Sequence, residues 1–121
     1  MDLPSARLLS VKMIWAGAPH CAFTDLIRHR GRWFCAFREA ASHALCAGRV
    51  RVLSSQDGLS WESAVLIAER GVDLRDPKLS QCGGGRLELL MGGSPIRKGQ
   101  YTGRRPRVCF SRRLAMLVGG R

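Results

Sequence analysis

Short strand-like runs repeat along this chain, and the repetition limits its fold more than any other feature. Seven runs are rich in β-branched, aromatic and other apolar residues and are separated by turn residues. They cover residues 22–28, 33–38, 49–53, 61–68, 76–81, 86–91 and 105–110. The Gly-Arg pair at 31–32 returns at 85–86 and the Arg-Val pair at 51–52 returns at 107–108, at spacings of 54 and 56 residues. A period of about 55 residues indicates a repeated structural unit.

These runs predict an all-β chain, and four antiparallel strands joined in sequence are the unit of a β-propeller blade. We therefore predict a partial β-propeller, with one complete four-stranded antiparallel blade at residues 22–70 and most of a second at residues 71–111. Residues 1–21 form an N-terminal segment. Residues 112–121 form a basic tail, because the repeat breaks off after Ser111. A truncated or frameshifted gene would explain that break.

The positive charge is concentrated in the last part of the chain. The formal net charge is +11, and all nine acidic residues lie at or before Glu88. Residues 1–88 carry twelve Lys or Arg against those nine acids, whereas residues 89–121 carry eight and no acid. Such a charge is typical of nucleic-acid binders. No aromatic ladder accompanies the basic residues, as single-strand binding requires, so nucleic-acid binding is disfavoured.

Cysteine spacing and hydropathy exclude several other classes. The five cysteines are odd in number and contain no Cys-x-x-Cys pair, which predicts reduced, mostly buried thiols, no zinc or other metal site and no cofactor. No run approaches the roughly 18 apolar residues of a membrane span. Asp2 and Lys12 make the N-terminus a poor secretory signal. Either the chain is cytoplasmic or its true start is missing.

The most specific local pattern is a seven-residue turn from Ser55 to Trp61, with the sequence Ser-Gln-Asp-Gly-Leu-Ser-Trp. Asp57 can accept hydrogen bonds from backbone N–H groups across a tight turn, and Gly58 supplies the backbone freedom that the turn needs. Ser55 can bond locally, and Trp61 can cover the hairpin with apolar area. All four residues build a turn rather than perform chemistry. The simpler interpretation is a plain Asp-Gly hairpin.

This turn resembles the Asp box of the sialidases and their BNR-repeat relatives. Residues 22–39 resemble the first blade of those proteins, and residues 72–79 resemble the start of the second. The Arg-Asp-Pro triplet at 75–77 is also similar to that of five-bladed glycosidases of the invertase type. The resemblance covers residues 20–111. It implies a propeller fold, and it makes the Asp box a structural marker at the blade edge.

The resemblance also sets expectations about activity. Sialidases carry Arg-Ile-Pro on the first strand, where Thr24-Asp25-Leu26 stands here, so a sugar other than sialic acid is implied. A six-bladed propeller needs over 300 residues, and the family's usual Tyr nucleophile lies in a later blade. The single Tyr here is Tyr101, in a basic loop. We therefore expect the isolated chain to be inactive and only marginally stable.

Glycosidases use paired carboxylates, and the polar residues of inner strands face a propeller's central channel. We predict Asp25 and Asp76 as the acidic pair, with Glu39 as the next candidate for proton transfer. Arg38 and Arg75 are predicted to contact substrate oxygens. The alternative is an internal salt-bridge network that holds the blades together. The three histidines show no ligand spacing and are expected at the surface or in loops: His20, His29 and His43.

Three functions remain open. The first is a sialidase-like exo-glycosidase with a glycan or small carbohydrate as its partner. The second is a non-catalytic glycan-binding or interaction propeller, and the third is a basic nucleic-acid-binding protein.

Overall fold

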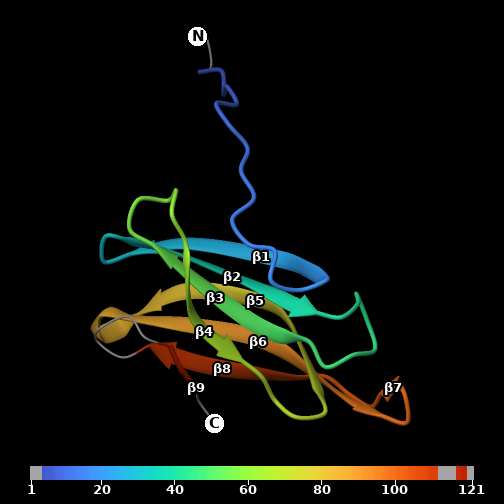
Figure 1. Ribbon diagram of the computed structural model, residues 1–121. Coiled ribbons are helices and arrows are strands. Elements are labelled where there is room, and N and C mark those ends of the chain that lie inside the picture. Colours follow the sequence, from blue (N-terminus) through green and yellow to red (C-terminus); the bar gives the residue numbers. More distant parts are fainter. Residues whose placement is uncertain (1–3, 112–116, 120–121) are drawn as a thin grey trace.

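The computed structural model describes residues 4–111 and 117–119 and consists of two antiparallel sheets (Figure 1). The first sheet follows chain order, from β1 (His20–His29) and β2 (Arg32–Ala40) to β3 (Arg49–Ser55) and β4 (Glu62–Ile67). Each strand overlaps one of the runs that the sequence predicted, with ends that differ by a few residues. The prediction of an all-β chain is confirmed, since the described residues contain no α-helix.

The second sheet repeats this order of antiparallel neighbours. It contains β5 (Val72–Cys82), β6 (Arg86–Arg97), β8 (Arg105–Ser111) and β9 (Leu117–Gly119), while the two-residue strand β7 (Gln100–Tyr101) pairs with β6. The 3-10 turn η1 (Gly83–Gly85) joins β5 to β6. Strand β9 falls within the predicted basic tail, and the rest of that tail lies outside the described residues. No helix in the described part of the chain could cross a membrane.

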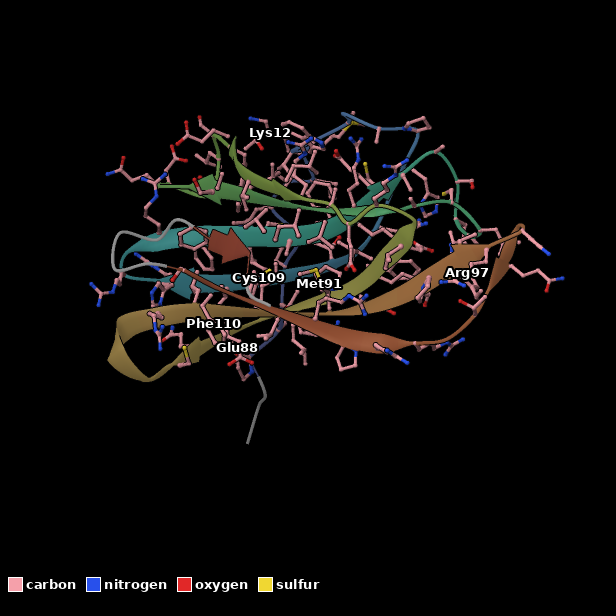
Figure 2. The ribbon with its side chains drawn as sticks, turned by 90° about the horizontal axis from the view of Figure 1, so that it is seen from below. Lys12, Glu88, Met91, Arg97, Cys109 and Phe110 are labelled. Carbon is pink, nitrogen blue, oxygen red and sulfur yellow. The ribbon has the colours of Figure 1, made fainter. Side chains whose placement is uncertain are left out.

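The two sheets pack face to face and enclose the main core. Apolar residues of both sheets form it: Phe34, Ala36, Val50, Val52, Val72, Leu74, Leu79, Leu87, Leu89, Met91 and Cys109. Figure 2 shows Met91 and Cys109 between the two layers, while Glu88 and Phe110 lie on the opposite side of the second sheet. This arrangement follows from the period of two along a strand, which places odd-numbered residues of β6 on the core side.

The other face of the first sheet is covered by segments outside the strands. Cys35, Phe37 and Leu53 form a second apolar cluster there, against Ile14, Trp15 and Trp61. Trp15 is further held because its indole N–H donates a 3.0 Å hydrogen bond to Glu39. Residues 4–11, which are exposed, extend away from the body of the protein (Figure 1).

A bulge interrupts the first strand of each sheet at an equivalent position. The register of β1 shifts between Ala22 and Asp25, and that of β5 shifts between Arg75 and Lys78. The two shifts are 53 residues apart (22 and 75, 25 and 78). Each contains a non-glycine residue with positive φ, Phe23 at 60° and Asp76 at 49°. The repeat seen in the sequence therefore extends to the backbone geometry.

Candidate functional site

A fully buried ion pair joins the two sheets. Arg38 of β2 donates a 2.8 Å hydrogen bond to Asp73 Oδ1 of β5, and neither side chain is exposed. Burial by itself would lower the pKa of Arg38, but the hydrogen bond and the charge of Asp73 outweigh it and raise that pKa. The same guanidinium donates to the carbonyl oxygen of Ser42 at 2.8 Å. Arg38 therefore anchors the β2–β3 loop to the second sheet.

Four donors satisfy the Asp73 carboxylate. Besides Arg38, the backbone N–H of Gly48 donates to Oδ1 at 3.1 Å. The other oxygen, Oδ2, accepts hydrogen bonds from the Tyr101 hydroxyl at 2.6 Å and from Arg75 at 3.3 Å. Because every lone-pair direction is engaged, Asp73 is a structural acid with no free oxygen for a ligand.

Tyr101 connects this buried network to the surface. Its hydroxyl oxygen accepts hydrogen bonds from the backbone N–H of Leu45 at 2.8 Å and from Arg75 at 3.1 Å. A tyrosine of the two-residue strand β7 thereby fixes both the β2–β3 loop and the guanidinium of Arg75. Gly48 is required where these groups cross, because a Cβ there would collide with Arg38 Nε and Asp73 Oδ1.

A pocket of about 410 Å³ opens directly above this network. Its volume lies within the range of small-molecule sites. Side chains and backbone of β1, β5, β6, β7 and two loops line it: Phe23, His43, Arg75, Asp76, Gly92, Ser94, Tyr101 and Arg104. The lining combines one carboxylate, two guanidinium groups and two hydroxyl groups with an aromatic wall. Such a set can hold a polar ring with both donors and acceptors.

Both bulged strands present their left-handed residue to this pocket. Phe23 and Asp76 each line it, and each has a positive φ, which costs free energy in a non-glycine residue. The guanidinium of Arg75 lies 5.2 Å from the centroid of the Phe23 ring, so the two residues form one wall. Strained backbone and bulges gather at binding and catalytic sites, and here two of them meet at one pocket.

The structure brings together two of the predicted site residues, Arg75 and Asp76, in this pocket. Asp76 is exposed there. Asp25, its predicted acidic partner, is not among the residues that line it. The Asp25 carboxylate instead accepts a 2.7 Å hydrogen bond from the backbone N–H of Leu79, just past the bulge of β5. Asp25 therefore ties the first strands of the two sheets together.

The roles predicted for Arg38 and Glu39 are wrong, because both side chains are buried and fully engaged. Arg38 is occupied by Asp73 and cannot reach a substrate. Arg51 donates two hydrogen bonds to the Glu39 carboxylate, at 3.0 and 2.7 Å. These bonds lower the pKa of Glu39, against the burial that raises it, and a carboxylate with a lowered pKa is a poor proton donor. The alternative, an ion pair that holds the two sheets together, describes Arg38, whereas the Glu39–Arg51 pair lies within the first sheet.

The predicted turn at Asp57 has the expected hydrogen bonds. Asp57 Oδ1 accepts from the backbone N–H groups of Leu59 at 2.8 Å and Ser60 at 2.9 Å, and these two bonds lower its pKa. The Ser55 hydroxyl accepts from the Gly58 N–H at 2.8 Å. Trp61 donates from its indole N–H to the Gly58 carbonyl at 3.1 Å and packs on the first sheet. Gly58 has φ of 79°, the left-handed conformation that favours glycine.

The expectations for histidine and cysteine need correction. His29 is buried in β1, with its Nε2 3.1 Å from the Gly85 carbonyl oxygen, rather than in a loop or at the surface. All five cysteines are free, as predicted. Most were expected to be buried, but the buried ones are only two of the five, Cys35 and Cys109. The described residues contain no group of three potential metal ligands.

Asp73, Tyr101 and Phe23 were not predicted as site residues. Asp73 lies in the apolar run Val72-Asp73-Leu74, and a charge between two apolar neighbours was the signal that could have identified it. Nothing in the sequence pairs Tyr101 with Asp73, because 28 residues separate them.

No family model matches this chain, and no curated protein matches it.

Proposed function

We propose that this chain forms the first two blades of a sialidase-like glycoside hydrolase acting on glycans, and that it is inactive as an isolated chain. Two successive four-stranded antiparallel sheets packed face to face support this proposal, because neighbouring propeller blades pack in this way. The Asp57 turn supports it further, since its hydrogen bonds use the Ser, Asp, Gly and Trp positions of an Asp box.

The observation that carries the proposal is the pocket between the bulges of β1 and β5. A sugar ring offers hydroxyl groups around its rim and apolar C–H groups on its faces. Asp76 and Arg75 can bond the hydroxyl groups, and Phe23 and His43 give the pocket aromatic surface. The 5.6 Å separation of the Phe23 and His43 ring centroids makes that surface continuous. We therefore assign Asp76 and Arg75 to glycan binding.

The proposed inactivity of the isolated chain follows from the number of free carboxylates. Glycoside hydrolysis normally requires two carboxyl groups beside the scissile bond, or in sialidases a tyrosine nucleophile together with an acid. The tyrosine at this pocket, Tyr101, donates its hydroxyl hydrogen to Asp73. Among the described residues, Asp76 is the one carboxylate that lines the pocket, and the nearby Asp73 is saturated by its four donors. Catalysis would then need a second group from further blades.

The same shortage of carboxylates favours the second candidate, a non-catalytic glycan-binding propeller. Binding needs the hydrogen-bonding set and the aromatic wall but no acid pair. Hydrolysis of aryl glycosides by a chain extended with further blades would favour the hydrolase, whereas binding without hydrolysis in that longer chain would favour the binding module.

The proposal is tested by measuring sugar binding to the 121-residue chain with ligand-detected NMR. We expect weak binding of at least one monosaccharide from a neutral and acidic panel, its loss in Asp76→Asn, and no hydrolysis of aryl glycosides. Glu62→Gln is the matched control, because Glu62 lies on β4 outside the pocket. Absence of binding for the whole panel would contradict a glycan site. Measurable hydrolysis would contradict the proposed inactivity.

A further inference from the structure

A second hollow, of about 560 Å³, lies beside the pocket at the far end of the second sheet. Its wall is formed by four arginines from the end of β6, the β7–β8 loop and β8, namely Arg97, Arg104, Arg105 and Arg107, and by Pro95 and Thr102. We call it the arginine groove. Figure 2 shows Arg97 near the tip of the long ribbon that β6 and β8 form. None of the described residues that line the groove is acidic.

The four arginines of the groove differ in whether a carboxylate neutralises them. Glu69 accepts two hydrogen bonds from Arg107, at 2.7 and 2.9 Å, so that arginine is neutralised and fixed in place. Arg97, Arg104 and Arg105 are exposed, and none of them forms an ion pair with a carboxylate in the described part of the chain. Lys98 is exposed beside Arg97. Three groove arginines, with Lys98 beside them, therefore face solvent without a counter-ion in the described part of the chain.

The arginine groove is continuous with the candidate site, because Arg104 lines both hollows. A ligand held by Asp76 and Arg75 in the pocket would thus extend past Arg104 into the groove. Only a chain-like ligand can occupy both hollows at once, and its units beyond the pocket would meet guanidinium groups instead of neutral surface.

We propose that the arginine groove binds the anionic units of a polysaccharide, sulfate or carboxylate groups, next to the sugar held in the pocket. This inference rests on the proposed function and specifies its ligand class. Guanidinium groups suit such ligands because they offer paired N–H donors that match the oxygens of sulfate and carboxylate. Cationic side chains that are already close together also attract a polyanion more strongly than separated ones do.

The groove fits an anionic glycan better than a nucleic acid. Single-stranded nucleic acid is bound by aromatic residues on which bases stack, and the groove lining in the described part of the chain contains no aromatic residue.

The test compares four probes on the 121-residue chain by titration calorimetry. They are a heparin-derived hexasaccharide, the same oligosaccharide after removal of its sulfates, a neutral hexasaccharide and a short DNA duplex. The key variant is the triple substitution Arg97→Gln, Arg104→Gln and Arg105→Gln. Its control removes the same charge from three exposed residues outside the groove, through Arg7→Gln, Arg28→Gln and Lys78→Gln.

We expect the sulfated hexasaccharide to bind, the groove variant to weaken that binding about tenfold or more, and the control variant to change it little. The desulfated probe separates sulfate from carboxylate recognition, and binding of either through the groove supports the inference. Equal weakening in both variants would overturn it, since net charge alone would then explain binding. Tighter binding of DNA than of either anionic hexasaccharide, lost in the groove variant, would also overturn it.

Monosaccharide binding in the pocket distinguishes this inference from the proposed function. The double variant Arg97→Gln and Arg105→Gln spares Arg104 and should leave that binding unchanged. If monosaccharides bind and no anionic hexasaccharide does, the inference fails and the proposed function stands. If an anionic hexasaccharide binds through the groove while no monosaccharide binds, the pocket assignment fails and the groove remains an anionic-glycan site.

Discussion

The two sheets have the same strand order but differ in how many of their faces are covered. In the first sheet every residue of β2 from Phe34 to Ala40 is buried, so both faces of that strand are shielded. In the second sheet β6 largely alternates between buried and exposed positions, and Leu90 on its outer side is 44% exposed. The difference comes from Ile14, Trp15 and Trp61, which pack on the first sheet from outside its strands. Covering segments, rather than the strands, thus decide whether a face becomes core.

The largest effect is expected at the contact between the sheets. Asp73→Asn would leave the buried Arg38 without a countercharge, and breaking such a pair by changing one partner costs about 3–5 kcal/mol. Chemical denaturation would measure the loss. Replacing both partners, Arg38→Met with Asp73→Leu, should recover part of it, because no buried charge remains. A single variant as stable as the unaltered protein would show that the ion pair does not hold the sheets together.

The same substitution, leucine to alanine, compares the covered outer face of the first sheet with the open outer face of the second. Leu53→Ala removes a fully buried side chain from the outer cluster of the first sheet and should cost about 2–5 kcal/mol. Leu90→Ala, on the outer side of the second sheet, should stay within about 0.5 kcal/mol. Similar losses for the two leucines, measured by urea unfolding, would contradict the difference between the faces.

Acid should weaken the covered outer face through Glu39. The pKa of Glu39 is lowered in the folded protein, so the stabilisation is present above its unfolded pKa of about 4.3 and is lost as pH falls through the folded value. Glu39→Gln should therefore cost about 1.5–3 kcal/mol at neutral pH, as for hydrogen bonds to charged groups, and much less once the pH is below the lowered folded pKa. A cost that is independent of pH in thermal unfolding curves would contradict the role of the charge.

A modest effect is expected at the Asp57 turn, which lies at the exposed end of the first sheet. Asp57→Ala removes the acceptor for two backbone N–H groups and should lower the melting temperature modestly. Gln56→Ala, at the neighbouring exposed position, is the control and should change it less. If both variants melt alike, the Asp57 hydrogen bonds contribute nothing measurable to the turn.

Local patterns were sufficient to predict the strands and the Asp57 turn. The alternation at Arg49–Ser55 and the turn residues beside it act over a few residues, and such information is contained in the sequence itself. Arg75 and Asp76, which line the pocket, could be named as candidates for the same reason, since they lie where an expected strand meets charged residues. The bulge that directs Asp76 to the pocket has no such local signature here.

The failures concern partners that are distant in the chain. Arg38 and Glu39 are adjacent and point to opposite faces of β2, so either could have been exposed. Arg38 became core because Asp73 lies opposite it in the second sheet, and Glu39 because Arg51 and Trp15 cover it. Tyr101 was assigned to a loop because its hydrogen bonds to Asp73 and Leu45 depend on how the two sheets pack.

The matching bulges of β1 and β5 have a consequence for how new specificity could be introduced. One backbone position, used twice, supplies two residues of the cavity lining, and these differ entirely: an aromatic ring at Phe23 and an acid at Asp76. The two bulges therefore share a backbone conformation, and the cavity is asymmetric because their side chains differ. Exchanging Phe23 and Asp76 would swap the positions of the aromatic ring and the carboxylate, while both positions kept their backbone conformation. A designer could then vary ligand preference at two positions whose geometry is already fixed.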